Sequence, residues 1–308
     1  MKILTLTMNP TIDISSSVAN VAANRKLRCK PPRYDPGGGG INVSRAIQHL
    51  GGDSTAIFPS GDPTGKVLQN MLQHEGITQE PIPIQQSTRE NVSITESSSD
   101  QQYRFVMPGP ELSEEEWQRC LQTLEDIEHP EFIVASGSLP PGVPRNFYAR
   151  VAKLAKQRDI KCIVDTKGEA LKHAVEEGVY CIKPNVRELS SLAGEQIQDE
   201  EQQASIAKRL IEQHQVEFVV VSLGSAGALL VTREMHERIN APIVDIKSKV
   251  GAGDSMVAGL VYSLVQGTSI REAAMFGIAA GTAAVKTAGS ELCHKADVEQ
   301  LYKSIRNN

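Results

Sequence analysis

The chain has 308 residues, of which 40% are hydrophobic and 22% are charged, and its formal net charge is −5. This composition is typical of a globular protein and excludes a chain disordered over its length. The acidic balance argues against a general nucleic-acid binder, which needs a concentrated basic face. No run approaches the roughly 20 apolar residues that span a bilayer, and the apolar stretch at residues 3–8 is too short for a signal peptide. We therefore expect a cytoplasmic protein whose partners include neither a membrane nor a nucleic acid.

Short β-branched runs alternate with helical patterns along the chain. We predict strands at residues 2–8, 55–59, 131–136, 160–165, 180–183, 217–223 and 228–232. The run from Phe218 to Val221 is almost wholly apolar, which is typical of a strand covered on both faces. Apolar stripes with helical spacing lie between the strands, as at Trp117, Cys120 and Leu124. This order predicts an α/β fold with a mostly parallel sheet and helices on both faces.

Two segments interrupt this rhythm. Residues 13–35 carry few large apolar groups and several basic ones, and residues 88–107 have the pattern of a hairpin with its turn at 97–100. An amphipathic sheet this small is not stable alone, so its apolar face must cover something. A lid over a pocket, a dimer contact and a surface excursion without function are the three alternatives. We expect a single domain over residues 1–308, with a lid formed by the insertions at 13–35 and 88–107.

The five cysteines are odd in number and form no C-x-x-C pair. A zinc site and a disulfide framework are therefore both disfavoured, and we expect reduced thiols that pack as small apolar residues.

A glycine turn at Val250-Gly251-Ala252-Gly253-Asp254-Ser255 runs into an apolar pattern with helical spacing. The first amides of a helix have no internal partner, and the helix dipole places positive charge there, so this turn can hold a phosphate. Asp254 can act as a general base on a hydroxyl bound beside that phosphate. It can equally well cap the helix, and the spacing alone does not choose between the two. On the dipole argument, we expect the pKa of Asp254 to be lowered.

Four consecutive glycines, Gly37 to Gly40, precede a second helical pattern. Such a run is costly in chain entropy, and it makes sense where a ligand lies against the main chain. Asn42 could then bind a sugar hydroxyl, although a plain flexible loop is the alternative. The segment is neither a dinucleotide fingerprint nor a P-loop.

Two further segments carry polar groups after predicted strands. Asn185 and Glu188 are three residues apart and share a helical face, which suits either the waters of a nucleotide-bound Mg²⁺ or a helix cap. The segment from Ser222 to Gly227 is either a plain turn or a loop beside a nucleotide.

Taken in this order, the four motifs resemble those of the ribokinase-like (PfkB) carbohydrate kinases. The similarity covers essentially the whole chain and extends to the phosphofructokinase branch through Leu27-Arg28-Cys29, residues 102–109 and residues 136–142. The resemblance implies a three-layer α/β/α sandwich with a small β lid that pairs two subunits into a homodimer. It also implies ATP and Mg²⁺ as cofactors, with K⁺ as a further candidate.

The resemblance also implies roles for individual residues. The catalytic set would be Asp254, as base for the C1 hydroxyl of the sugar, with the amides of Gly251, Ala252 and Gly253 as anion hole. The sugar phosphate would contact Asp13, Lys26, Arg28, Gly38, Gly39, Asn42, Arg89, Arg104 and Ser138, with Arg28 reaching the neighbouring subunit. ATP would contact Lys183, Asn185, Ser222, Gly224 and Gly227. Mg²⁺, mostly through water, would be held by Asp165, Asn185 and Glu188, and K⁺ by Ser248, Val250, Ala284 and Gly289. At Thr287 and Glu291 the chain departs from the Asn and Arg expected beside that K⁺ site.

The expected reaction is ATP-dependent phosphorylation of fructose 6-phosphate to fructose 1,6-bisphosphate. Tagatose 6-phosphate kinase and 1-phosphofructokinase are the alternatives, but those enzymes typically carry Lys where this chain has Gly39. Two readings from other classes are a non-catalytic nucleotide- or sugar-phosphate-binding regulator and an NAD-dependent oxidoreductase. Retention of Asp254 argues against the first, and the absence of a dinucleotide fingerprint after the first strand argues against the second.

Overall fold

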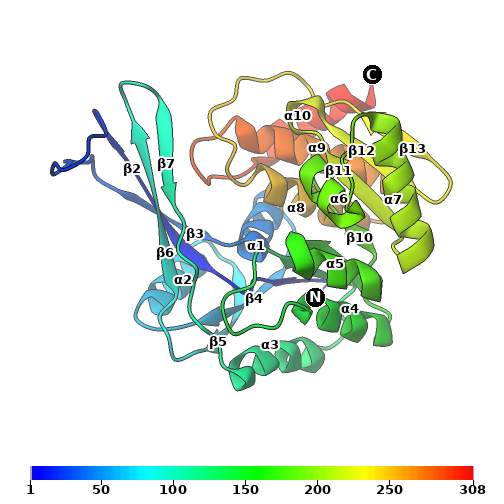
Figure 1. The fold of residues 1–308 in the computed structure, drawn as a ribbon, viewed down its shortest axis with the longest axis horizontal. Coiled ribbons are helices and arrows are strands. Elements are labelled where there is room, and N and C mark those ends of the chain that lie inside the picture. Colours follow the sequence, from blue (N-terminus) through cyan, green and yellow to red (C-terminus); the bar gives the residue numbers. More distant parts are fainter. Residues whose placement is uncertain (1, 308) are drawn as a thin grey trace.

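A nine-stranded sheet runs through the computed structural model, which describes residues 2–307 (Figure 1). In spatial order its strands are β13 (His236–Ile239), β12 (Ala228–Thr232), β11 (Phe218–Ser222), β10 (Cys181–Ile182), β9 (Lys161–Asp165), β8 (Phe132–Ser136), β1 (Ile3–Leu6), β4 (Thr55–Ser60) and β5 (Thr78–Pro83). All neighbours are parallel except the pairs β11–β12 and β12–β13. The seven predicted strands are all present, and the sequence-based prediction missed only the two edge strands of this sheet, β5 and β13.

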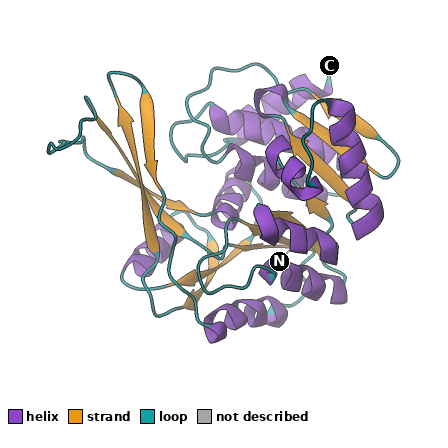
Figure 2. Cartoon of the chain, viewed as in Figure 1, coloured by secondary structure: helices purple, strands orange, loops and turns teal. Residues whose placement is uncertain are grey.

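Helices cover both faces of this sheet (Figure 2). One layer consists of α3 (Glu114–Asp126), α4 (Phe147–Gln157), α5 (Gly168–Glu177), α6 (Val186–Ala193) and α7 (Glu200–His214). The other consists of α1 (Gly39–Leu50), α2 (Thr64–His74), α8 (Ala252–Val265), α9 (Ile270–Val285) and α10 (Lys295–Arg306). Strand β11 shows why the sheet needs both layers: Val219 and Val221 pack toward the first, while Phe218 and Val220 pack toward the second. The predicted three-layer α/β fold is confirmed.

A separate four-stranded sheet stands beside the two helical layers and is seen at the left of Figure 1. Its order is β3 (Arg33–Gly37), β2 (Thr11–Val18), β6 (Arg89–Glu96) and β7 (Gln101–Phe105). Strands β6 and β7 form the predicted hairpin. The segment 13–35, predicted only as an irregular insertion, contributes most of β2 and β3, and residues 19–32 form an exposed loop between them.

The two faces of this small sheet differ in chemistry. One cross-strand row joins Tyr34, Ile14, Val92 and Phe105 and is therefore apolar. The neighbouring rows on the opposite face contain Asp13 opposite Asn91, and Ser93 opposite Arg104. Because side chains alternate along a strand, the polar rows point one way and the apolar row points the other. Tyr34 and Phe105 remain about half exposed, at 52% and 54%.

All five cysteines are free thiols, and four of them pack in the interior as predicted, but Cys29 does not. Cys120, Cys162, Cys181 and Cys293 are buried free thiols, and Cys29 is exposed in the loop between β2 and β3. Burial raises the pKa of Cys120 and of Cys162 to about 12. Among residues 2–307, no helix is long and apolar enough to cross a membrane.

Candidate active site

The polar groups of the site gather at the carboxyl ends of the parallel strands. Ser136 closes β8, Asp165 closes β9, Lys183 follows β10 and Ser222 closes β11. In open α/β sheets this edge is where ligands bind, because the loops that leave the strands diverge there.

Asp254 is the third residue of α8 and does not cap it. Gly251 is the N-cap, with a φ of 74°, a left-handed conformation that favours glycine. The Asp254 carboxylate instead accepts a 2.8 Å hydrogen bond from Nδ2 of Asn42 on α1. The alternative that Asp254 caps the helix is therefore excluded: its side chain faces the second glycine motif rather than the amides of its own helix.

The run of four glycines is a place of close packing rather than a flexible loop. A Cβ on Gly39 would overlap Oγ of Ser136 and lie 2.8 Å from the amide nitrogen of Gly137. The Ile41 amide, one turn into α1, donates a 2.7 Å hydrogen bond to Oγ1 of Thr7. The start of α1 therefore packs directly against the ends of β1 and β8. This packing fixes the direction in which Asn42 points.

A cavity of about 490 Å³ opens between α1, α8 and the small sheet. Twelve of the predicted site residues line it: Asp13, Gly38, Gly39, Asn42, Arg89, Arg104, Ser138, Asp165, Glu188, Val250, Gly251 and Asp254. Eight others were not predicted: Thr11, Asn91, Val106, Ser136, Gly137, Thr166, Lys167 and Lys249. Most of these flank predicted residues, so extending each motif by one or two positions would have found them. Asn91 needed the β2–β6 register, which the sequence did not reveal.

The pKa of Asp254 is raised to about 6, not lowered as we expected. Burial of the carboxyl is the main cause, and the charge of Asp165 adds to it, while the Asn42 hydrogen bond and Lys183 act in the opposite direction. The dipole argument failed because it ignored desolvation, which outweighs it here. Asp254 is therefore a stronger base than predicted and still ionised at neutral pH.

Lys183 forms an ion pair with one carboxylate of the site and is influenced by the charge of another. Its Nζ lies 3.3 Å from Oδ1 of Asp165 and about 3.5 Å from where a Cβ on Gly253 would be. Burial lowers the pKa of Lys183, but the charges of Asp165 and Asp254 outweigh this, so that the pKa is raised overall. Lys183 is therefore protonated at neutral pH and places a positive charge beside the first turn of α8.

The small sheet presents two arginines and a carboxylate to the cavity. Asn91 donates a 3.0 Å hydrogen bond to Asp13. Burial raises the pKa of Asp13, while this hydrogen bond and the charges of Arg89 and Arg104 lower it. Arg89 also donates to the carbonyls of Asn9, Pro10 and Met107. A guanidinium has five N–H groups. Three of those on Arg89 make these contacts, so two remain for a ligand.

Residues 5–297 match the family described as pfkB family carbohydrate kinase. The chain belongs to this family. It is 45% identical to the ATP-dependent 6-phosphofructokinase isozyme 2 of Mycobacterium tuberculosis, with 98% of this chain and 89% of that protein covered. It is 40% identical to the same isozyme of Escherichia coli, with 98% of both chains covered.

Solved structures of phosphofructokinase-2 from Escherichia coli have the same fold. The complex with potassium matches with a TM-score of 0.96 at 39% identity and covers 99% of both chains. The E. coli protein has also been solved with fructose-6-phosphate and in a tetrameric inhibited form, each with a TM-score of 0.94 and 99% coverage of both chains, at 38% and 39% identity.

In this pfkB chain, Asn185 and Glu188 form a capping box at the start of α6. Each side chain accepts a 2.9 Å hydrogen bond from the backbone amide of the other. The capping alternative is therefore present, and Glu188 also lines the cavity. Asn185 bridges to Ser222 at the end of β11, and Gly224 to Ala226 form a 3₁₀ turn before Gly227. None of the five expected ATP ligands, Lys183 included, lines the cavity; they lie at and after the ends of the neighbouring strands β10 and β11.

Besides the ATP ligands, seven predicted residues do not line the cavity: Ala252, Gly253, Lys26, Arg28, Ser248, Ala284 and Gly289. Lys26 and Arg28 lie on the exposed loop between β2 and β3. Of the residues predicted for K⁺, Gly289 and Val250 line a smaller neighbouring pocket. Ser248 donates a 2.9 Å hydrogen bond to the Gly289 carbonyl, and Thr287 donates to the Ala284 carbonyl at 2.8 Å.

Proposed function

We propose that this pfkB-family chain is an ATP-dependent 6-phosphofructokinase that transfers the γ-phosphoryl group of ATP to the C1 hydroxyl of fructose 6-phosphate. The observation that carries this proposal is the cavity that Asp254 and Gly251, at the start of α8, line together with Arg89 and Arg104. The isozyme 2 relatives and the E. coli complex with fructose-6-phosphate support the choice of substrate.

The reaction follows from where charge develops. As the C1 oxygen bonds to the γ-phosphorus, its proton passes to the Asp254 carboxylate, and the bond to the leaving ADP oxygen breaks. The amides of Gly251, Ala252 and Gly253, at the start of α8, would compensate the negative charge of the transferring group. Asn42 holds the carboxylate of Asp254 in place. Asp13, Gly38 and Gly39 would contact the sugar hydroxyls, and Arg89, Arg104 and Ser138 would bind the 6-phosphate.

The donors at the strand ends fit a Mg²⁺ ion that belongs to the nucleotide. Asp165 and Glu188 line the cavity, and among residues 2–307 no cluster of three or more His, Cys, Asp or Glu could hold a metal by itself. Mg²⁺ bound to phosphates usually keeps several waters and takes few protein oxygens. When bound, the ion neutralises charge on the phosphates, and Asp165, Glu188 and Asn185 would orient its waters.

K⁺ is a further proposed ligand, beside the anion-hole turn. The Ser248 hydroxyl lies 2.9 Å from the Gly289 carbonyl oxygen, and Val250 and Gly289 line the same small pocket. Oxygen is the ligand type that alkali cations use, and the Ala284 carbonyl completes the proposed set. The potassium complex of the E. coli relative supports this assignment. A comparison of kcat in K⁺ and in a tetraalkylammonium salt at equal ionic strength tests it, and an unchanged kcat would remove the site.

We also propose that the small sheet is a lid and that its apolar face pairs two copies of the chain. The polar rows line the cavity, while the row Tyr34, Ile14, Val92 and Phe105 points away from it. A second copy would cover that row and bring Lys26 and Arg28 toward the 6-phosphate of its neighbour. This accounts for two predicted phosphate ligands that one chain alone leaves on the surface.

The substrate is tested by measuring kcat/KM for fructose 6-phosphate, tagatose 6-phosphate and fructose 1-phosphate side by side. We expect fructose 6-phosphate to be preferred, because Gly39 leaves the lid cations as the phosphate-binding groups. A tenfold preference for fructose 1-phosphate, equal to about 1.4 kcal/mol of transition-state binding, would contradict the proposal. Absence of ADP release with all three would favour the non-catalytic regulator.

A further inference from the structure

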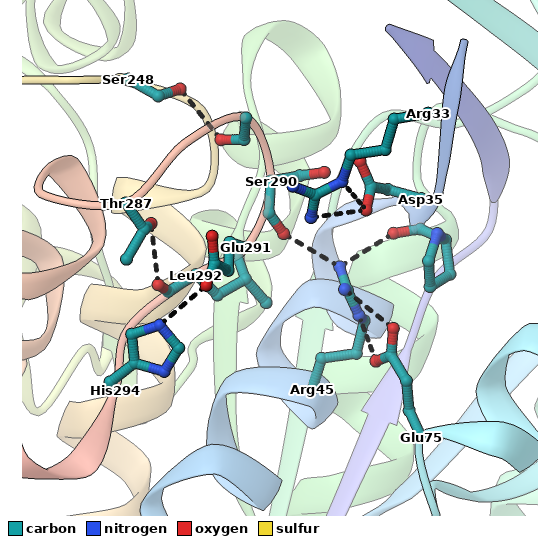
Figure 3. A network of polar contacts seen from close by, with 12 residues as sticks. Arg33, Asp35, Arg45, Glu75, Ser248, Thr287, Ser290, Glu291, Leu292 and His294 are labelled. Carbon is teal, nitrogen blue, oxygen red and sulfur yellow. Dashed lines mark hydrogen bonds and ion pairs between the residues drawn. The ribbon is translucent and has the colours of Figure 1, made fainter. Parts of the chain in front are cut away.

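Arg45 is a buried charged side chain that the proposed mechanism does not use. It lies on α1, three residues beyond Asn42, and its side chain is only 4% exposed. Its Nε and Nη2 donate to the two carboxylate oxygens of Glu75 at 2.6 and 2.9 Å. Its Nη1 donates to two backbone carbonyls, those of Pro36 at 3.1 Å and Ser290 at 3.2 Å (Figure 3).

These two carbonyls belong to segments that are far apart in the sequence and lie next to residues of the site. Pro36 lies in β3, immediately before the glycines that line the sugar side. Ser290 lies in the loop 286–294, which joins α9 to α10. The same helix therefore presents Asn42 to the catalytic base and, one turn later, Arg45 to both flanking segments.

The loop 286–294 packs directly against the anion-hole turn. A Cβ on Gly251 would overlap Cδ2 of Leu292, so the two segments are in close contact. Ser248 joins them a second time, because it donates to the Gly289 carbonyl and accepts a 3.1 Å hydrogen bond from the Val250 amide. Displacement of this loop would therefore move the amides of Gly251, Ala252 and Gly253.

We propose that Arg45 is a positioning residue for phosphoryl transfer, which fixes the spacing between the sugar-binding glycines and the anion-hole turn. It touches neither substrate and acts through Pro36 and Ser290. Glu75 compensates the buried charge of the guanidinium. Only a planar group with donors on both edges can bind a carboxylate with one edge and two carbonyls with the other, so lysine cannot replace it.

The test compares Arg45→Lys with two control variants in the kinase assay. For Arg45→Lys we expect kcat to fall at least tenfold, while KM for ATP changes less than threefold, because the expected ATP ligands follow β10 and β11 and are not in the segments that Arg45 contacts. Glu75→Gln leaves the Nη1 contacts in place and is expected to retain kcat within about threefold. Arg271→Lys changes a similar bidentate pair with Glu237, on α9 and far from the cavity, and is expected to leave kcat unchanged.

All variants are assayed well below their melting temperatures, so that unfolding does not enter the comparison. An Arg45→Lys kcat within twofold of wild type would overturn the proposal. A loss in Glu75→Gln as large as in Arg45→Lys would also overturn it, since the ion pair rather than the carbonyl contacts would then matter.

The kinetic test of Arg45 rests on the proposed function. A second measurement, which needs no substrate, tests the role of Arg45 separately. Hydrogen exchange of the free protein is compared between wild type and Arg45→Lys. Faster exchange at residues 250–254 and 286–294, with other segments unchanged, is expected even if the preferred sugar phosphate is a different one. Unchanged exchange in both segments would contradict the role of Arg45, whatever the substrate is.

Discussion

At the scale of single residues, the site is governed by a competition around Asp254. Burial and the nearby charge of Asp165 favour the protonated form of the carboxyl, while the Asn42 hydrogen bond and Lys183 favour the ionised carboxylate. Burial prevails, and the pKa rises to about 6. The sequence identified this residue and its helix because glycine spacing and apolar period are local features. It could not predict the pKa, which depends on groups brought together from α1, β9 and β10.

Replacement of Asp254 by Asn separates catalysis from stability. We expect kcat to fall by about 100- to 10,000-fold, the usual contribution of a general base. The raised pKa means that ionising Asp254 destabilises the folded chain, by no more than about 3 kcal/mol. The penalty is absent below pH 3.8 and complete above about pH 6. Denaturant unfolding should therefore show the variant to be more stable than wild type at pH 8, with the gap closing toward pH 4. Near-normal kcat would contradict the assignment of the base.

The pH dependence of kcat/KM reports the same group. Because the base must be deprotonated, kcat/KM should rise with pH through about 6 and level off above it. Asn42→Ala removes the hydrogen bond that lowers the pKa of Asp254, so the rising limb of the kcat/KM profile should move to higher pH. Asn91→Ala is the matched control, because its amide binds Asp13 instead and should leave the limb in place. An unshifted limb in Asn42→Ala would contradict this coupling.

At the scale of elements, two helix starts form the centre of the site. The N-termini of α1 and α8 meet across the cavity, and the side chain of Asn42 bridges them. The buried strands were predictable because they are apolar on both faces. The sequence-based prediction missed strand β5 because this edge strand carries two prolines and polar residues. It missed β2 because a run of three serines weakens the strand pattern. The pairing of β2 with β6 is non-local, so no sequence pattern placed Asn91 beside Asp13.

Gly39→Ala tests whether the seating of α1 positions the sugar site. The added methyl would overlap Ser136 and displace the start of α1. We expect KM for fructose 6-phosphate to rise at least tenfold, as measured in steady-state assays. Gly168→Ala is the control: its Cβ meets open space, but its φ of 64° makes the substitution strained. It should lower the melting temperature and leave KM unchanged; the same KM in both variants would refute the argument.

At the scale of the whole molecule, the small sheet packs on the helical layers through Ile12, which is buried with Ile41 and Leu68, and its two faces meet different environments. Its polar rows complete the cavity, and its apolar row is left half exposed in a single chain. The hydrophobic pattern of the hairpin predicted that something must cover this face. The sequence could not show that the apolar row extends across all four strands, because that depends on the register of β2 with β3 and β6.

Phe105→Asp tests the pairing of two copies. A charge at the β7 end of the apolar row should dissociate the proposed dimer and raise KM for fructose 6-phosphate, because Lys26 and Arg28 of the partner would be lost. Sedimentation velocity measures the first effect and steady-state kinetics the second. Met235→Asp adds the same charge at another exposed apolar residue, before β13, and should change neither. If wild type sediments as a monomer at micromolar concentration, the pairing is wrong.

The distribution of thiols makes the β2–β3 loop accessible to spectroscopy. Four of the five cysteines are buried, and burial raises the pKa of their thiols, so that they carry almost no reactive thiolate near neutral pH. Cys29, between Arg28 and Lys30, is exposed. A maleimide dye should therefore attach at this position alone in the native protein. Its emission would follow the movement of the basic loop in real time, without engineering a cysteine-free background.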